Sequence, residues 1–91
     1  MFMTTKREEL ADFYIDVDLL FLDEIEYDAA IIGVCEQYGC ELKVAYNANR
    51  IITILMNMDN LSYDDAVGYF ENNIIGSYVG EKTPVFVWDI E

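Results

Sequence analysis

The strongest amphipathic pattern lies in the last third of the chain and predicts a helix over residues 62–75. Ser62 stands at the N-cap position, and Asp64 and Asp65 follow on the first turn, where exposed N–H groups and the helix macrodipole favour negative charge. Gly76 comes next, where a residue in the left-handed conformation would end the helix. The apolar positions recur at three- and four-residue spacing and are Ala66, Val67, Phe70, Ile74 and Ile75. We therefore expect this helix to pack inward, with Phe70 as its most buried aromatic side chain.

Two short strands are predicted as well. After the helix, Gly80 permits a turn, and Pro84 biases the residue before it toward an extended conformation. Residues 85–88 are β-branched and aromatic, which is typical of a strand. Earlier in the chain, residues 42–46 alternate, with Leu42, Val44 and Tyr46 on one face.

Two further helices are predicted in the middle of the chain. Asp28 is placed to cap a helix over residues 29–38, which Gly39 would end, and Gly33 inside it indicates close packing against another backbone. Asn47 is placed to cap a helix that runs to about residue 57. Its apolar residues leave little polar circumference and are Ile51, Ile52, Ile54, Leu55, Met56 and Met58. We expect burial on most sides and an antiparallel hairpin with the helix over 62–75.

Residues 5–22 support two interpretations. Thr5 and Glu8 fit a capping box, and apolar residues at helical spacing predict a helix to about Leu22. Residues 13–21 also alternate strictly, which would suit a strand, and periodicity alone does not separate the two. We predict the helix. The whole chain, residues 1–91, is then one α+β domain with about four helices packed on a short two- or three-stranded sheet.

The charge of the chain narrows the range of partners. Acidic residues outnumber basic ones by 18 to 5, there is no histidine, and the formal charge is −13. Nucleic acid and anionic membranes attract positive charge, so we expect neither to bind directly. A run without any basic residue, here called the acidic segment, carries Asp16, Asp18, Asp23, Glu24, Glu26 and Asp28. We predict that the acidic segment binds a protein partner that has a basic surface.

The apolar content points to further contacts. With 54% apolar residues the chain should fold, and a domain of this size cannot bury all of that surface, so we expect a homodimer. Tyrosine is enriched at interfaces, although core and rim packing is its commoner role. The candidate interface residues are Tyr63, Tyr69, Tyr78 and Glu81. No apolar run of about 18 residues and no secretory signal is present, so we expect a cytoplasmic protein.

No pattern of catalytic residues stands out. Cys35 and Cys40 match neither the spacing of paired zinc ligands nor a redox motif, and we expect two reduced thiols. Asp16 and Asp18 follow an apolar stretch, as in haloacid-dehalogenase-type phosphotransferases, but the other motifs of such enzymes are missing from the sequence. No calcium-binding loop and no nucleophile–histidine pair occurs. We therefore predict a protein that is not an enzyme and has no metal or cofactor, with a small metal-dependent enzyme as the remaining alternative.

Residues 28–86 resemble a family of short uncharacterised proteins encoded by bacteriophages. The matching pieces are AIIGV at 30–34, VAY at 44–46, ITILM at 52–56, SYDDAVGYFE at 62–71 and NIIGSYVGEKTP at 73–84. The resemblance implies a phage origin and the cytoplasm of an infected bacterium, and it supplies no catalytic residues. Together with the charge, it suggests an acidic protein that inhibits a host nucleic-acid-binding or defence protein, as a DNA mimic would. The alternative is a structural or assembly accessory protein of the phage.

Overall fold

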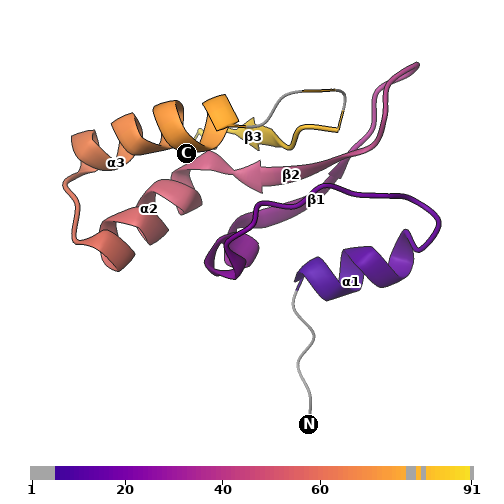
Figure 1. Ribbon diagram of the computed structural model, residues 1–91, viewed down its shortest axis with the longest axis horizontal. Coiled ribbons are helices and arrows are strands. Elements are labelled where there is room, and N and C mark those ends of the chain that lie inside the picture. The colour runs from indigo at the N-terminus through magenta and orange to yellow at the C-terminus, as the bar shows by residue number, and fades with distance from the viewer. Residues whose placement is uncertain (1–5, 78–79, 81, 91) are drawn as a thin grey trace, which may run out of the picture.

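A three-stranded mixed sheet stands at the centre of the protein (Figure 1). The computed structural model describes residues 6–77, 80 and 82–90. The strands are Ile31–Cys35 (β1), Lys43–Asn47 (β2) and Val85–Val87 (β3), in the order β1-β2-β3. β1 pairs antiparallel with β2, and β3 pairs parallel with it. The central strand β2 is consequently the most buried of the three, with Val44 and Tyr46 fully enclosed.

Four helices accompany the sheet in the described part of the chain. They are α1 (Lys6–Phe13), the 3-10 helix η1 (Ile25–Ala30), α2 (Ala48–Asp59) and α3 (Tyr63–Tyr69), which continues through a π-turn, η2 (Phe70–Ile74), into a 3-10 turn, η3 (Ile75–Ser77). In Figure 1, α2 and α3 lie side by side at one end of the molecule, and α1 lies beside β1. The α+β class predicted from the sequence is thus confirmed. None of the described helices has both the length and the apolar character needed to cross a membrane.

The helical hairpin of α2 and α3 forms where its capping residues predict it. The backbone N–H of Arg50 donates to Asn47 Oδ1 at 3.1 Å, and that of Asp65 donates to Ser62 Oγ at 3.2 Å. Each side chain satisfies one of the N–H groups that a helix start leaves unpaired. Asn60 then ends α2 in the left-handed conformation, with φ of 55°.

The end of the last helix differs from the prediction. Gly76 does not adopt a positive φ, and the backbone stays helical through the π-turn to Ser77. A π-turn holds one more residue than an α-turn, so it changes the direction in which the following side chains point. Phe70 and Ile74, the first and last residues of this turn, are both buried. Because both side chains pack in the core, the backbone around them is held in a helical conformation, and the helix runs past Ile75.

The helix predicted over residues 29–38 is wrong, because β1 occupies half of that range and η1 ends at Ala30. Its β-branched residues pair with β2, and Gly39, with φ of +79°, forms part of the connecting turn. Asp28 therefore caps no helix and lies within η1. Gly33 stands beside the irregularity in the β1–β2 pairing, and a Cβ there would meet no atom of the described residues within 4 Å. The close backbone packing expected at this glycine is absent.

Neither interpretation of residues 5–22 is correct over its full length. Helix α1 ends at Phe13, and the chain then turns and runs extended to Leu22 without joining the sheet. Asp16 and Asp18 would oppose the macrodipole near the end of a longer helix. The extended course brings Leu22 into the core, where it is 1% exposed. Thr5, half of the predicted capping box, lies outside the described residues.

One hydrophobic core joins the sheet to the helical hairpin. Phe70 is fully buried, as predicted, and its ring meets those of Phe86 and Trp88 edge-on, with centroids 5.1 and 5.8 Å away. Helix α2 contributes Ile51, Ile52 and Leu55, while Met58 at its end is exposed. The buried core residues are Leu22, Tyr27, Ala30, Ile31, Val44, Tyr46, Ala48, Ile51, Ile52, Leu55, Ala66, Phe70 and Ile74.

Candidate functional site

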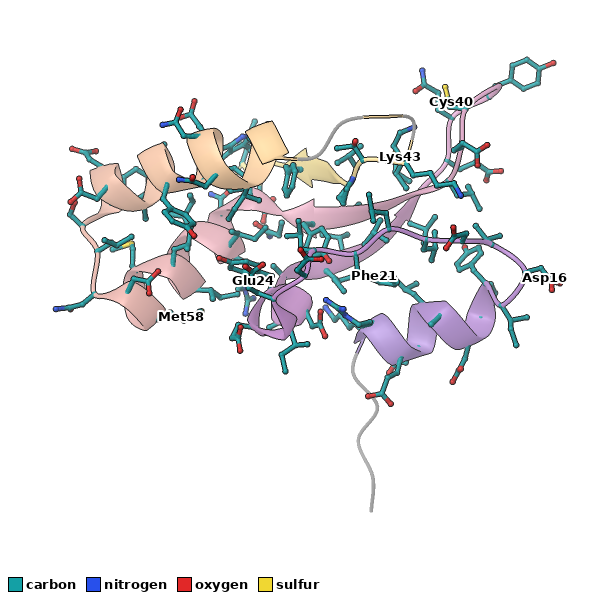
Figure 2. The ribbon with its side chains drawn as sticks, viewed as in Figure 1. Asp16, Phe21, Glu24, Cys40, Lys43 and Met58 are labelled. Atoms are coloured by element: carbon teal, nitrogen blue, oxygen red, sulfur yellow. The ribbon has the colours of Figure 1, made fainter. Side chains whose placement is uncertain are left out.

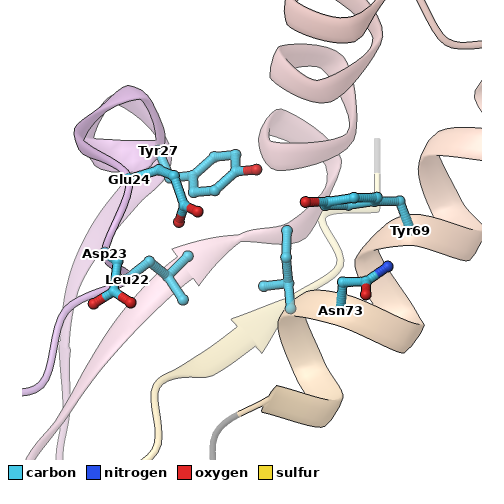
Figure 3. A pocket seen from close by; sticks show the side chains of 7 residues that line it. Leu22, Asp23, Glu24, Tyr27, Tyr69 and Asn73 are labelled. Atoms are coloured by element: carbon cyan, nitrogen blue, oxygen red, sulfur yellow. The ribbon is translucent and has the colours of Figure 1, made fainter.

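A cleft of about 230 Å³ lies between the chain leading into η1 and the end of the α3 helix (Figure 3). We call it the Tyr27 cleft. Its lining combines two apolar side chains with two carboxylates, two tyrosines and an amide. These residues are Leu22, Asp23, Glu24, Tyr27, Tyr69, Asn73 and Ile74. The Tyr27 cleft therefore joins Asp23 and Glu24 of the acidic segment to Tyr69, one of the candidate interface residues.

Hydrogen bonds hold the acidic wall of the cleft in place. The backbone N–H of Leu22 donates to the Tyr46 hydroxyl of the central strand at 3.0 Å, and Arg7 Nη2 donates to the Leu22 carbonyl. The backbone N–H of Tyr27 donates to the Glu24 carbonyl at 3.2 Å. Residues 22–27 are thus tied both to the sheet and to α1, so the positions of Asp23 and Glu24 follow from the fold.

The opposite wall comes from the irregular end of the α3 helix. Tyr69 is the last residue of α3, and Asn73 lies within the π-turn η2. Residues four apart in a helix share a face, which brings both side chains to the cleft. Single π-turns occur often at functional sites. The π-turn η2, which carries the helix past its predicted end, therefore also shapes this wall of the cleft.

The inside of the cleft is electronegative. Tyr27 is 3% exposed, and its pKa is raised from 10.0 to about 12, first by burial and then by the charge of Glu24. Tyr69, Asp59 and Glu26 add smaller contributions in the same direction. The part of this shift that comes from the carboxylates has the opposite sign for a cation, so these charges favour one, whereas burial disfavours any charge. The hydroxyl of Tyr27 stays neutral in this setting and can both donate and accept a hydrogen bond.

The rest of the acidic segment does not form one surface with the cleft. Asp16 lies in the turn after α1, far along the molecule from Glu24 (Figure 2). Asp18 is exposed, and its Oδ2 lies 3.3 Å from Lys82 Nζ. Glu26 is exposed on η1. The structure thus separates the acidic segment into a part near the end of α1 and a part at the Tyr27 cleft.

Asp28, which the sequence assigns to the partner-binding surface, is buried in the structure. It is 8% exposed, and Arg7 Nε donates to its Oδ1 at 2.9 Å. The same guanidinium lies 5.1 Å from the centroid of the Phe21 ring. A buried carboxylate requires such a partner, so Asp28 has a structural role.

Two of the candidate interface residues, Tyr63 and Tyr69, do not lie at the same site. Tyr69 is 41% exposed at the Tyr27 cleft, whereas Tyr63 is 56% exposed at the start of α3 and does not line the cleft. Tyr78 and Glu81 lie outside the described residues.

Sequence reasoning missed Tyr27 and Asn73 as site residues. Tyr27 did carry a signal, because it is an aromatic residue inside a run of acids.

No group of three or more cysteine, aspartate or glutamate side chains suited to hold a metal ion occurs among the described residues. Cys35 is half-buried and Cys40 is exposed, and both are free thiols. The residues that line the Tyr27 cleft offer negative charge, aromatic contact and hydrogen bonding. Comparisons of the chain with protein-family models, with curated proteins and with solved structures find no match.

Proposed function

We propose that this protein is a non-enzymatic acidic protein that binds a partner protein through a basic surface of the partner. The observation that carries the proposal is the Tyr27 cleft, where Glu24 and Asp23 stand beside two tyrosines. Tyrosine supplies a rigid contact area with a polar end, and carboxylates select a positive partner. The cleft is a defined site on this acidic protein at which a basic partner can bind.

The few basic residues support this proposal, because most of them bind their own chain. Lys6 Nζ donates to the Ile31 carbonyl at 2.9 Å, and Lys43 Nζ to the Glu41 carbonyl at 3.2 Å. Arg7 pairs with Asp28, and Lys82 with Asp18. The formal charge of −13 already counts all five basic residues, and four of these five contact their own chain. A field of this sign accelerates encounter with basic proteins and weakens as salt rises.

The resemblance of residues 28–86 to short phage proteins supports a setting for this activity. In an infected bacterium, an acidic protein that covers the nucleic-acid-binding surface of a host protein competes with phosphates for the same basic residues. We therefore propose inhibition of a host nucleic-acid-binding or defence protein in the bacterial cytoplasm.

The test has two parts. Protein immobilised through its N-terminus is used to retain partners from host lysate at low and at high salt, and each retained partner is then assayed for nucleic-acid binding with and without this protein. The proposal expects a partner that is released by salt and whose nucleic-acid binding this protein inhibits. If retained partners are insensitive to salt, or bind nucleic acid equally well in its presence, the proposal is wrong.

Charge-matched variants make the test specific to the cleft. Glu24→Gln removes one charge from the Tyr27 cleft, and Glu36→Gln removes one from the exposed β1–β2 connection, which extends away from η1 in Figure 1. Glu24→Gln should weaken partner binding more than Glu36→Gln does. Recovery of the protein from purified phage particles would instead favour the alternative, an assembly accessory protein.

A further inference from the structure

We propose that the Tyr27 cleft takes a single arginine side chain from the basic partner, with its guanidinium between Glu24 and the two tyrosines. This inference rests on the proposed function and specifies its central contact. The size of the cleft, the chemistry and charge of its walls, and the Tyr27 hydroxyl support it.

The size of the cleft suits a side chain better than a cofactor. Its volume is about 230 Å³, whereas pockets for small molecules and cofactors are usually about 300 to 1,000 Å³. The apolar side chains of Leu22 and Ile74 also line it. They match the aliphatic part of a long basic side chain, which buries its stem while its charged end finds polar partners.

The polar walls suit a guanidinium in particular. Figure 3 shows Glu24 on one wall and Tyr69 on the other, with the Tyr69 hydroxyl pointing toward Tyr27. A guanidinium is planar, donates paired hydrogen bonds to a carboxylate and stacks on aromatic rings. Lysine provides a compact and strongly hydrated charge without a stacking face. The combination of carboxylate and tyrosine therefore favours arginine.

The Tyr27 hydroxyl adds a further polar group to the cleft. Tyr27 is 3% exposed, and its hydroxyl points toward Tyr69 (Figure 3). A hydroxyl oxygen accepts hydrogen bonds. An N–H of the incoming guanidinium donates to this oxygen, and the Glu24 carboxylate neutralises the charge.

The experiment uses N-acetyl-arginine methylamide as the probe. It is titrated into the isotopically labelled, full-length protein at physiological salt, and the chemical shifts of the backbone and of the tyrosine rings are followed by NMR. We expect saturable changes concentrated at Tyr27, Tyr69 and Asn73. The citrulline analogue has nearly the same shape without the charge, and the lysine analogue has the charge without the planar group; both should bind at least about fivefold more weakly.

Variants separate the cleft from the general acidity. Glu24→Gln should weaken binding of the arginine probe by about tenfold, and Tyr27→Phe by about three- to tenfold, because each removes one hydrogen-bond partner of the guanidinium. Glu36→Gln, with the same loss of charge outside the cleft, should change it by less than about twofold. Shift changes spread over the whole acidic surface, or equal binding of the citrulline analogue, would overturn the arginine site.

Failure of this inference is distinguishable from failure of the proposed function. If Glu24→Gln binds a salt-sensitive partner as well as Glu36→Gln does, the arginine site is wrong and the proposed function stands. If the arginine probe binds in the cleft and the partners bind nucleic acid normally in the presence of this protein, the proposed inhibition is wrong and the site stands.

Discussion

Arg7 and Asp28 form an ion pair that joins the first helix to the chain entering the sheet. Arg7 Nε lies 2.9 Å from Asp28 Oδ1, with the two side chains 27% and 11% exposed. The guanidinium also donates to the Leu22 carbonyl and covers the Phe21 ring. One arginine thus fixes both ends of the segment that forms the acidic wall of the Tyr27 cleft.

We predict that Arg7→Ala lowers the free energy of unfolding by about 2 to 3 kcal/mol. Removing Arg7 leaves the buried Asp28 carboxylate without its counter-charge. Because Arg7 is partly exposed, the loss of stability is smaller than for a fully buried pair. Urea unfolding measures the change. Arg50→Ala, which removes an exposed arginine from α2, should alter stability by less than about 0.5 kcal/mol. Equal losses in the two variants would show that the ion pair adds no stability.

Phe70→Ala should destabilise the domain by about 3 to 5 kcal/mol. The ring is fully enclosed and packs against Phe86 and Trp88, so its removal leaves a cavity and two aromatic contacts unmade. A loss of this size is comparable to the total stability of a small domain. Thermal unfolding followed by circular dichroism is the measurement. A Phe70→Ala protein that still melts cooperatively near the wild-type temperature would contradict the central place of this ring in the core.

Stability should fall in alkaline solution because of Tyr27. Its pKa in the folded protein is about 12, against 10.0 for an unperturbed tyrosine. Between these values the unfolded chain has lost the proton that the folded chain keeps, so rising pH favours unfolding. The contribution is fully present below pH 10 and is lost as the pH rises through this window.

Tyr27→Phe checks this pH dependence, because it removes the titrating group. The urea midpoint of the variant should fall less than that of the wild type between about pH 9 and about pH 11. Tyr63→Phe is the matched control, since Tyr63 is 56% exposed. If Tyr27→Phe and Tyr63→Phe keep the same alkaline slope as the wild type, burial of Tyr27 does not govern this loss.

The homodimer stays a prediction from the composition. Large apolar side chains remain exposed, among them Phe13 at 76% and Ile15 at 79%. Two copies together carry twice the formal charge of −13, so association should tighten as salt screens their repulsion. Analytical ultracentrifugation at micromolar concentration and increasing salt measures it. A single 10.5 kDa species at every salt concentration would exclude the dimer.

The parts of the fold that the sequence predicts correctly are those specified by neighbouring residues. Asn47 and Ser62 cap their helices through atoms only three residues away, and Phe70 follows from helical spacing. Strand β1 depends instead on pairing with β2, so its local pattern alone wrongly predicts a helix. The extended course of residues 18–22 likewise depends on contacts with Arg7 and Tyr46.

The site was predictable only in part for the same reason. Acidic residues and tyrosines are visible in the sequence, which therefore predicts Glu24, Asp23 and Tyr69 as candidates. Their meeting in one cleft depends on the position of η1 against the hairpin of α2 and α3 and on the π-turn that contains Asn73. The burial of Asp28 depends on Arg7 in another helix. No local pattern contains these relationships.

The parallel pairing of β3 with β2 also shapes how the chain reaches its folded state. Ala45 pairs with Val85, and both helices of the hairpin lie between these two residues in the sequence. Contacts within that hairpin form between near neighbours, whereas this strand pairing closes a long loop and carries its entropic cost. We therefore expect the helical hairpin to assemble early and the sheet to close in a later, slower step, which also brings Phe86 and Trp88 over Phe70.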